Sequence, residues 1–426
     1  MKRFLILVFT IWTTAIAQRP PSPTELSGHP FFITKTWMVG GVGDWDYLAM
    51  DPVARQLFIA HGPAVQVVDV STGTLAGTVT GLRQAHAVVL DPEGALGYVT
   101  DGPVSAVKVF DRRSLQVVAS IPTGPAPRAM ALEPQTGLLF VIGAQTARRA
   151  SGASDAHGSV QGNTTQGNTG RGSSPAGRGP KSTVTVIDIE ARKQLAQIIL
   201  SGSLGFAQAD GNGHVYVTVS DRNQIMRLDA QAVANALHGL IDASNSPQPA
   251  GPARGSGKEL LLDWSRDANP APPVEVRPHM FSLGAECQEP RSIALDATHQ
   301  RLFAACTNMK MIVLNGETGE PVVSVPIGPG ADAIGYDANR GLIFSANGGG
   351  DGSLTVIRQD VTDTYAVVQI LPTLQRARTL AINSSTGEVY LATVLSGAVL
   401  NRPPVNGAPL KMNPVDSSFQ VLVVGN

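Results

Sequence analysis

A unit of about 40 residues recurs seven times along this chain. Its clearest copy spans residues 291–328, where four short apolar runs are separated by turns. Each run is too short for a typical helix and is rich in Val, Ile, Leu and Phe, so strands are the better assignment. One such sheet cannot bury both of its faces, whereas neighbouring copies can stack and share a continuous core. The recurrence therefore constrains the fold more than any other feature.

An acidic or amide residue closes the first strand of each copy and sets the period. Successive markers lie 40, 42, 41 and 46 residues apart wherever no insertion intervenes. The seven markers are Asp51, Asp91, Glu133, Asp210, Asp296, Asp337 and Asn383. The third strand of four copies also ends on an aspartate, at Asp69, Asp111, Asp188 and Asp229. Seven four-stranded units at this period predict an all-β protein, a seven-bladed β-propeller.

The two ends of the chain are predicted to complete one blade together. The last copy has only three strands, of which the final one lies at residues 419–425, and a lone strand-like run at residues 31–39 would supply the fourth. Joining them closes the ring and removes a free sheet edge. The 45 glycines and 30 prolines agree with this fold, since they indicate many turns and little helix. Residues 31–426 are therefore expected to form a single propeller domain.

Three insertions interrupt the repeat, at residues 145–180, 231–275 and 394–418. The first has almost no large apolar residue and is predicted to be disordered. The second is expected to begin with a short amphipathic helix and to continue as a loop. The third is a Pro-rich loop. Because strands alternate in direction, the first and third insertions should leave one face of the ring and the second the opposite face.

The N-terminus has the pattern of a secretory signal peptide, residues 1–17. Lys2 and Arg3 precede an apolar run at residues 4–12, and a small-residue site predicts cleavage after Ala17. The run is too short for a typical membrane span, although an uncleaved anchor is the alternative. Residues 18–30 then form a tether. We expect a secreted or periplasmic protein with no membrane span in the mature chain, and its net charge of −1 gives no field that attracts nucleic acid.

The repeat resembles a known propeller family. Residues 90–101, 295–308 and 382–393 each close a hairpin on a Tyr/Phe-Val-Thr-like strand, and a Val-x-Val-x-Asp-like strand follows in other copies. This pattern is similar to the YVTN-type, or YncE-like, β-propeller repeat family. The resemblance covers nearly all of the mature chain apart from the insertions. It implies the fold but no single function, because such families include binding proteins and surface-layer components.

Charged residues gather at the start of the innermost strands, five residues before each marker. In chain order these positions hold Asp46, His86, Arg128, Gly205, Arg291, Asp332 and Arg378. In a propeller they would form a ring around the mouth of the central channel. Three guanidiniums in such a ring can bind a carboxylate or phosphate through paired hydrogen bonds. The alternative is that these charges only neutralise one another.

The two cysteines fall near this ring: Cys287 lies four residues before Arg291, and Cys306 ends the second strand of the fifth copy. In an oxidising compartment an even pair predicts a disulfide, with two buried thiols or a weak metal site as the alternatives. The eight histidines are scattered and show no zinc-binding spacing, so no metal and no cofactor are predicted.

These features favour an exported binding or scaffold protein that recognises a small anionic ligand or a protein partner at the channel face. One alternative is a periplasmic lactonase-like hydrolase, in which His86 acts with Asp46 or Asp332 as general acid and base. The sequence shows no nucleophile or metal for that chemistry, which favours a non-enzymatic role. A structural component of the cell envelope is a third possibility.

Overall fold

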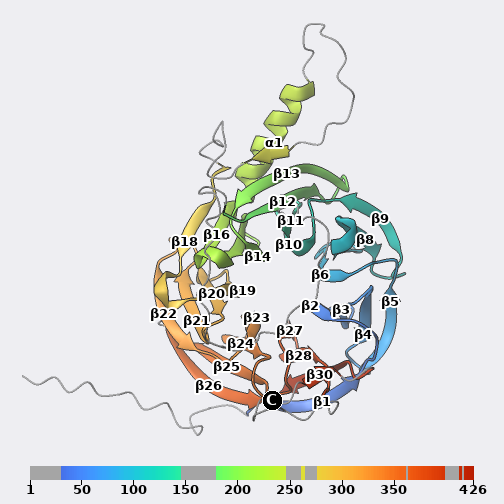
Figure 1. Ribbon diagram of the computed structural model, residues 1–426, viewed down its shortest axis with the longest axis vertical. Coiled ribbons are helices and arrows are strands. Elements are labelled where there is room, and N and C mark those ends of the chain that lie inside the picture. The colour runs from blue at the N-terminus through green and yellow to red at the C-terminus, as the bar shows by residue number, and fades with distance from the viewer. Residues whose placement is uncertain are drawn as a thin grey trace, which may run out of the picture.

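The computed structural model describes residues 30–144, 179–245, 261–263, 276–360, 363–398, 412–414 and 417–426. It places seven sheets as blades around one axis, and Figure 1 views them along that axis. The innermost strand of each sheet lies beside the innermost strands of its two neighbours. The predicted all-β, seven-bladed propeller is therefore confirmed.

The first four blades follow the chain in order from the inside of the ring outwards. Blade 1 holds β2 (Trp45–Asp51), β3 (Gln56–His61), β4 (Ala64–Asp69) and β5 (Thr74–Val79). Blade 2 holds β6 (Ala85–Leu90), β7 (Leu96–Asp101), β8 (Ala106–Asp111) and β9 (Val117–Pro122). Blade 3 holds β10 (Pro127–Glu133), β11 (Leu138–Ala144), β12 (Lys181–Asp188) and β13 (Lys193–Ser201). Blade 4 holds β14 (Leu204–Ala209), β15 (His214–Val219), β16 (Gln224–Asp229) and β18 (His279–Ser282).

The last three blades repeat this arrangement, and the seventh takes its outer strand from the other end of the chain. Blade 5 holds β19 (Pro290–Asp296), β20 (Arg301–Cys306), β21 (Lys310–Asn315) and β22 (Pro321–Pro326). Blade 6 holds β23 (Ala331–Asp337), β24 (Leu342–Asn347), β25 (Ser353–Asp360) and β26 (Thr364–Pro372). Blade 7 holds β27 (Thr379–Asn383), β28 (Glu388–Thr393), β31 (Gln420–Gly425) and β1 (Phe32–Met38). Single turns of 3₁₀ helix lie at η2 (Gly102–Val104), η3 (Ser220–Arg222) and η5 (Gly284–Glu286).

The marker residues owe their recurrence to turn chemistry. Asp51 Oδ1 accepts hydrogen bonds from the backbone N–H groups of Val53 and Ala54, at 3.1 and 2.9 Å. Asn383 accepts in the same way from Ser385, at 3.2 Å. A short polar side chain that bonds to the backbone two or three residues later stabilises a turn. Each innermost strand therefore ends where its sequence supplies such a residue.

The hydrophobic core consists of the interfaces between blades. The buried residues fall into seven clusters in the described part of the chain, and each cluster joins two adjacent blades. Between blades 1 and 2, for example, Phe58 packs against Phe110 with ring centroids 5.9 Å apart. Each blade thus buries its two faces against its two neighbours.

The ring closes through pairing of the two chain ends. Strand β1 pairs antiparallel with β31, and the blue N-terminal strand lies beside the red C-terminal segment in Figure 1. Trp37 of β1 stacks on Tyr390 of β28 with ring centroids 5.5 Å apart. The indole is 7% exposed and belongs to the cluster between blades 7 and 1. The predicted closure is confirmed.

The second and third insertions contain regular structure in their described residues. The expected helix forms as α1 (Ala230–Asn245), which buries Val233 and Leu237 against blades 3 and 4 and projects beyond the rim (Figure 1). The residues after it were expected to be loop, but β17 (Leu261–Asp263) pairs parallel with β13 as a fifth strand of blade 3. The third insertion contains a short hairpin of β29 (Ser396–Ala398) and β30 (Met412–Pro414).

Several predictions concern residues that lie outside the described part of the chain. These are the signal peptide at residues 1–17, the tether apart from Pro30, and the predicted disorder of residues 145–178. Among the described residues, no helix is both long and apolar enough to cross a bilayer.

Removing the buried indole of the closing strand should destabilise the protein. Trp37→Ala is expected to lower the free energy of unfolding by about 3–5 kcal/mol, because it leaves a cavity between blades 7 and 1. Met38→Ala is the matched control, since its side chain is 61% exposed on the same strand. Urea denaturation measures the free energy of unfolding of both variants. Far-UV circular dichroism is the signal to follow, because it reports on the backbone and not on the removed indole. Equal stability of the two variants would show that β1 does not hold the ring closed.

Candidate functional site at the channel mouth

The charged ring forms at a backbone irregularity that six blades share. In blade 3 the regular pairing breaks between Pro127 and Ala129, and in blade 6 between Ala331 and Ala333. The residues at these breaks are Arg128 and Asp332. A β-bulge leaves an extra residue unpaired and redirects its side chain. The same break surrounds the ring positions of the other four blades, Asp46, His86, Gly205 and Arg291.

Two side-chain pairs link neighbouring blades around the ring. His86 Nδ1 of blade 2 lies 3.0 Å from Asp46 Oδ2 of blade 1. Arg378 Nε, at the start of blade 7, lies 3.3 Å from Asp332 Oδ2 of blade 6. The second contact is an ion pair without hydrogen-bond geometry, since the buried Arg378 Nε has no hydrogen-bond partner. These four predicted residues are therefore brought together as two pairs.

The remaining guanidiniums of the ring have other neighbours. Arg291 Nη2 of β19 lies 3.2 Å from the Oε2 atom of Glu289, in the loop that precedes this strand. Burial raises the pKa of the Tyr47 hydroxyl, and the positive charge of Arg128 lowers that pKa by a smaller amount. The ring thus combines two linked pairs with an arginine whose carboxylate partner lies in its own entry loop.

Charges from several blades act on the carboxyl of Asp332, which contacts Arg378. Burial raises the pKa of its carboxyl above the ordinary range for aspartate. The guanidinium of Arg378 offsets part of this rise, the Asp46 carboxylate adds to it, and Arg291 lowers the pKa again. The four residues come from blades 1, 5, 6 and 7. Their mutual influence follows from proximity in a partly desolvated space.

Two aromatic side chains cross the channel next to the ring, and sequence reasoning missed them. Tyr47 of blade 1 and Phe206 of blade 4 meet edge to face, with ring centroids 5.3 Å apart. Because these blades are three positions apart in the ring, the contact spans the axis. Burial, followed by the carboxylates of Asp46 and Asp332, raises the pKa of Tyr47 well above its usual value. The hydroxyl therefore stays protonated beneath the charges.

A signal for this aromatic floor exists in the sequence. Each of the two residues directly follows a ring position. The other five blades carry a small residue at the same place, namely Ala87, Ala129, Ser292, Ala333 and Thr379. In blades 1 and 4 this position holds a large aromatic residue instead. Such an exception in two blades that face each other predicts a contact across the axis.

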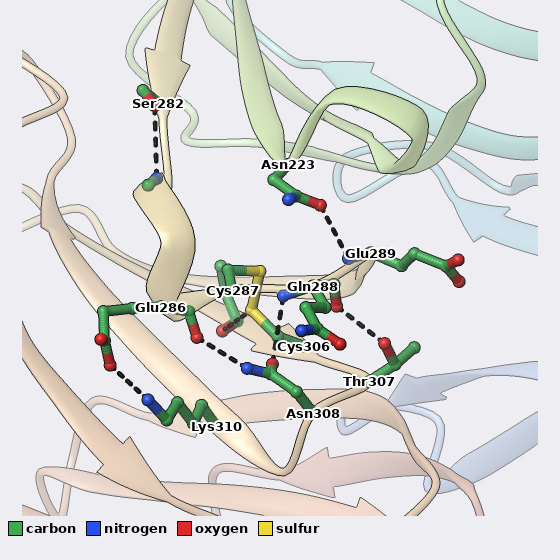
Figure 2. Close-up of a disulfide and its surroundings, with 12 residues drawn as sticks. Asn223, Ser282, Glu286, Cys287, Gln288, Glu289, Cys306, Thr307, Asn308 and Lys310 are labelled. Atoms are coloured by element: carbon green, nitrogen blue, oxygen red, sulfur yellow. Dashed lines mark hydrogen bonds and ion pairs between the residues drawn. A yellow bond between two sulfur atoms is a disulfide. The ribbon is translucent and has the colours of Figure 1, made fainter.

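The predicted disulfide is confirmed. Cys287 and Cys306 are bonded, with Cα atoms 5.4 Å apart, and both are fully buried. The bridge ties the loop that enters blade 5 to the end of β20, as Figure 2 shows. Around it, Gln288 N–H donates to Asn308 Oδ1 at 3.1 Å, and Asn308 Nδ2 donates to the carbonyl of Glu286 at 2.9 Å. The segment leading to Arg291 is therefore held at several points.

Other blades hold the corresponding loop by hydrogen bonds. In blade 2 the buried carboxylate of Asp101, at the end of β7, accepts from the backbone N–H groups of Arg83 and Gln84 at 3.0 Å. In blade 7, Thr393 Oγ1 donates to the carbonyl of Gln375 at 3.0 Å. The disulfide thus takes the place of a polar clamp that recurs around the ring.

A hollow of about 180 Å³ lies between blades 4 and 5 near the turns that end their innermost strands. It is therefore on the face opposite the charged ring. Its polar groups largely bond to one another: His214 Nδ1 lies 3.0 Å from Asp210 Oδ2, and the Tyr216 hydroxyl donates to the carbonyl of Gly316 at 2.9 Å. No cluster of three or more metal-ligating side chains occurs in the described ranges.

Comparison with known proteins identifies the fold and nothing finer. No protein-family model matches the chain. No curated protein sequence matches it either. Among solved structures, it is similar to a chain of the mitotic checkpoint complex, with a TM-score of 0.61, 11% identity, and coverage of 98% of this chain and 99% of that one.

Two further solved structures show the same architecture. The WD40 repeats of RRP9 match with a TM-score of 0.59 and 9% identity over 91% of this chain and 96% of that one. A chain of Kuenenia stuttgartiensis hydrazine synthase matches with a TM-score of 0.50 and 14% identity over 75% and 84%. Since identity is this low, the likeness defines the class, a β-propeller repeat protein, and leaves the site to be argued from its own chemistry.

Breaking the disulfide should weaken the fifth blade. Reduction, or Cys287→Ala with Cys306→Ala, is expected to lower the free energy of unfolding by about 2–4 kcal/mol, because the loop gains freedom in the unfolded chain. Denaturation with and without reductant measures this. The double variant is the control, since reductant should not change its stability further. A wild-type protein that is indifferent to reductant would contradict the bridge.

Proposed function

We propose that this chain is an exported, YVTN-type propeller that binds a small anionic ligand or a protein partner at the channel mouth. The observation that carries the proposal is the charged ring above an aromatic floor. Guanidiniums at Arg128, Arg291 and Arg378 would hold oxyanions, and the Tyr47–Phe206 contact would support the apolar part of the ligand. Ligand sites commonly combine an apolar lining with a few convergent polar groups. The proposal requires no cofactor.

The β-bulges support a site at the mouth, because they turn six ring positions away from regular pairing. Bulges are frequent beside functional sites because they redirect side chains. The hairpin of β29 and β30 follows β28, whose end lies on the same face, so it would flank an incoming ligand or partner.

Export is supported by the cysteine chemistry as well as by the N-terminal pattern. Disulfides persist in oxidising compartments and are rare in the cytosol. The bond between Cys287 and Cys306 therefore agrees with cleavage after Ala17 and a mature protein in the periplasm or outside the cell.

A ligand of the mouth should depend on the ring guanidiniums. In a thermal-shift screen of anions and sugar acids, we expect at least one compound to raise the melting temperature of the wild type. Arg128→Ala and Arg291→Ala should each weaken its affinity about tenfold or more, because each removes charge-assisted hydrogen bonds. Arg113→Ala is the control, since Arg113 is exposed in the β8–β9 turn on the opposite face.

If no compound stabilises the wild type selectively, the small-ligand form of the proposal is contradicted. A protein partner then remains, and capture of partners by the wild type should be lost in Arg291→Ala but kept in Arg113→Ala. If neither variant loses partner capture, a structural role in the cell envelope explains the protein better than binding at the mouth.

One observation favours the hydrolase alternative. The contact between His86 Nδ1 and Asp46 Oδ2, at 3.0 Å, is the kind by which a carboxylate orients a catalytic histidine. However, the opposite edge of the imidazole faces Gly102, where an added Cβ would lie 3.2 Å from His86 Nε2. A general base needs that nitrogen to reach the substrate. The geometry therefore supports a positioning pair rather than a base.

This reasoning predicts no lactone hydrolysis above background. A panel of lactones assayed with the wild type and with His86→Gln should give equal, uncatalysed rates. Hydrolysis by the wild type that falls at least about a hundredfold in His86→Gln would establish the enzyme instead, since general-base catalysis contributes that much.

A further inference from the structure

Two guanidiniums share one tryptophan at the edge of the mouth between blades 7 and 1. Arg376 Cζ lies 5.4 Å from the centroid of the Trp45 ring, and Arg378 Cζ lies 5.5 Å from it. Both arginines belong to the loop that enters β27, whereas Trp45 opens β2. A guanidinium within about 6 Å of an indole is attracted by the ring. The tryptophan therefore holds two like charges at one place.

The carboxylates near these arginines accept only weak hydrogen bonds, or none, from the two guanidiniums. Arg376 Nη2 lies 3.5 Å from Asp44 Oδ1, which is long for a charge-assisted hydrogen bond, typically about 2.7–2.9 Å. Arg378 reaches Asp332 without hydrogen-bond geometry. The buried Nε1 of Trp45 has no hydrogen-bond partner among the described residues either. Several donors at this spot thus lack a well-placed acceptor.

The charges around Arg376 and Arg378 also leave room for a further anion. Burial lowers the pKa of Arg376, and the neighbouring positive charge of Arg378 lowers it further, while Asp44 offsets part of the effect. Partly buried like charges raise each other's energy, and a bound anion relieves that repulsion. Solvent still reaches both side chains, which are 29% and 35% exposed.

The backbone around the two arginines is tightly fitted. Arg376 N–H donates to the carbonyl of Gly348 at 2.8 Å. A Cβ added at Gly348 would lie 2.8 Å from Arg378 Cβ and 3.2 Å from the backbone of Arg376. Glycine is therefore needed for the β24–β25 loop to approach the β26–β27 loop. This contact fixes the positions from which both guanidiniums extend.

We propose that Arg376 and Arg378, held against Trp45, form a subsite for an oxyanion, the carboxylate or phosphate group of a ligand. Two adjacent guanidinium forks suit the planar or tetrahedral oxygens of such groups. The subsite rests on the proposed function, because it lies on the rim of the same mouth. The proposal adds Arg376 to the residues of the mouth. It also makes the Asp44 carboxylate an internal anion that competes with the ligand for Arg376.

The test measures binding of inorganic phosphate and of gluconate, separately, by isothermal titration calorimetry at low ionic strength. Wild type should bind at least one of them. Arg376→Gln and Arg378→Gln should each raise the dissociation constant about tenfold or more. Asp44→Asn should lower it, because the competing carboxylate is removed from an exposed loop position. Arg113→Gln, on the opposite face, should match the wild type. Phosphate binding alone would assign the subsite to phosphate groups, and gluconate binding alone to carboxylates.

Two results would overturn the subsite. One is the absence of measurable binding of either probe by the wild type at millimolar concentration. The other is binding that survives in Arg376→Gln, Arg378→Gln and Asp44→Asn unchanged. If Arg291→Ala abolishes that same binding, the proposed function stands and only this subsite is wrong. Asp44→Asn keeps the test decisive even if an arginine variant folds poorly, since its expected effect has the opposite sign.

Discussion

Packing of each blade against its two neighbours is the interaction on which the rest of the structure depends. A four-stranded sheet with two apolar faces is stable only when both are covered, and each of the seven buried clusters covers one such interface. The ring must therefore close, which β1 achieves by pairing with β31. Without that pairing the sheet of blade 7 would lack its outer strand and present β31 as an edge.

Closure also creates the candidate site. Seven innermost strands that begin at one face bring seven sequence-distant positions around one axis, and bulges turn six of these positions from the regular sheet. Charge then accumulates where the strands converge. The Asp46–His86 pair joins adjacent blades, and Tyr47 with Phe206 joins blades across the axis. The mouth is thus a consequence of the fold, whereas its chemistry depends on which residues occupy the repeated positions.

Much of this architecture could be predicted because it repeats. Period, turn markers and ring positions all follow from local patterns that seven copies reinforce, and the Cys287–Cys306 bridge follows from proximity within one copy. The parts that were missed do not repeat. Strand β17 is three residues within an insertion, and it forms because the outer edge of β13 is available to it. Arg376 lies two residues outside the ring position, so the repeat gives no reason to single it out.

By itself the sequence determined the number of blades, the way the ring closes, and which charged residues stand at the start of the innermost strands. These properties follow from the spacing of residues along the chain, which the sequence gives directly. Only the tertiary structure decided which charges pair, that two aromatics meet across the channel, and that Arg376 and Arg378 share Trp45. Such contacts join blades far apart in sequence, and their geometry depends on bulges and loop paths that no local pattern specifies.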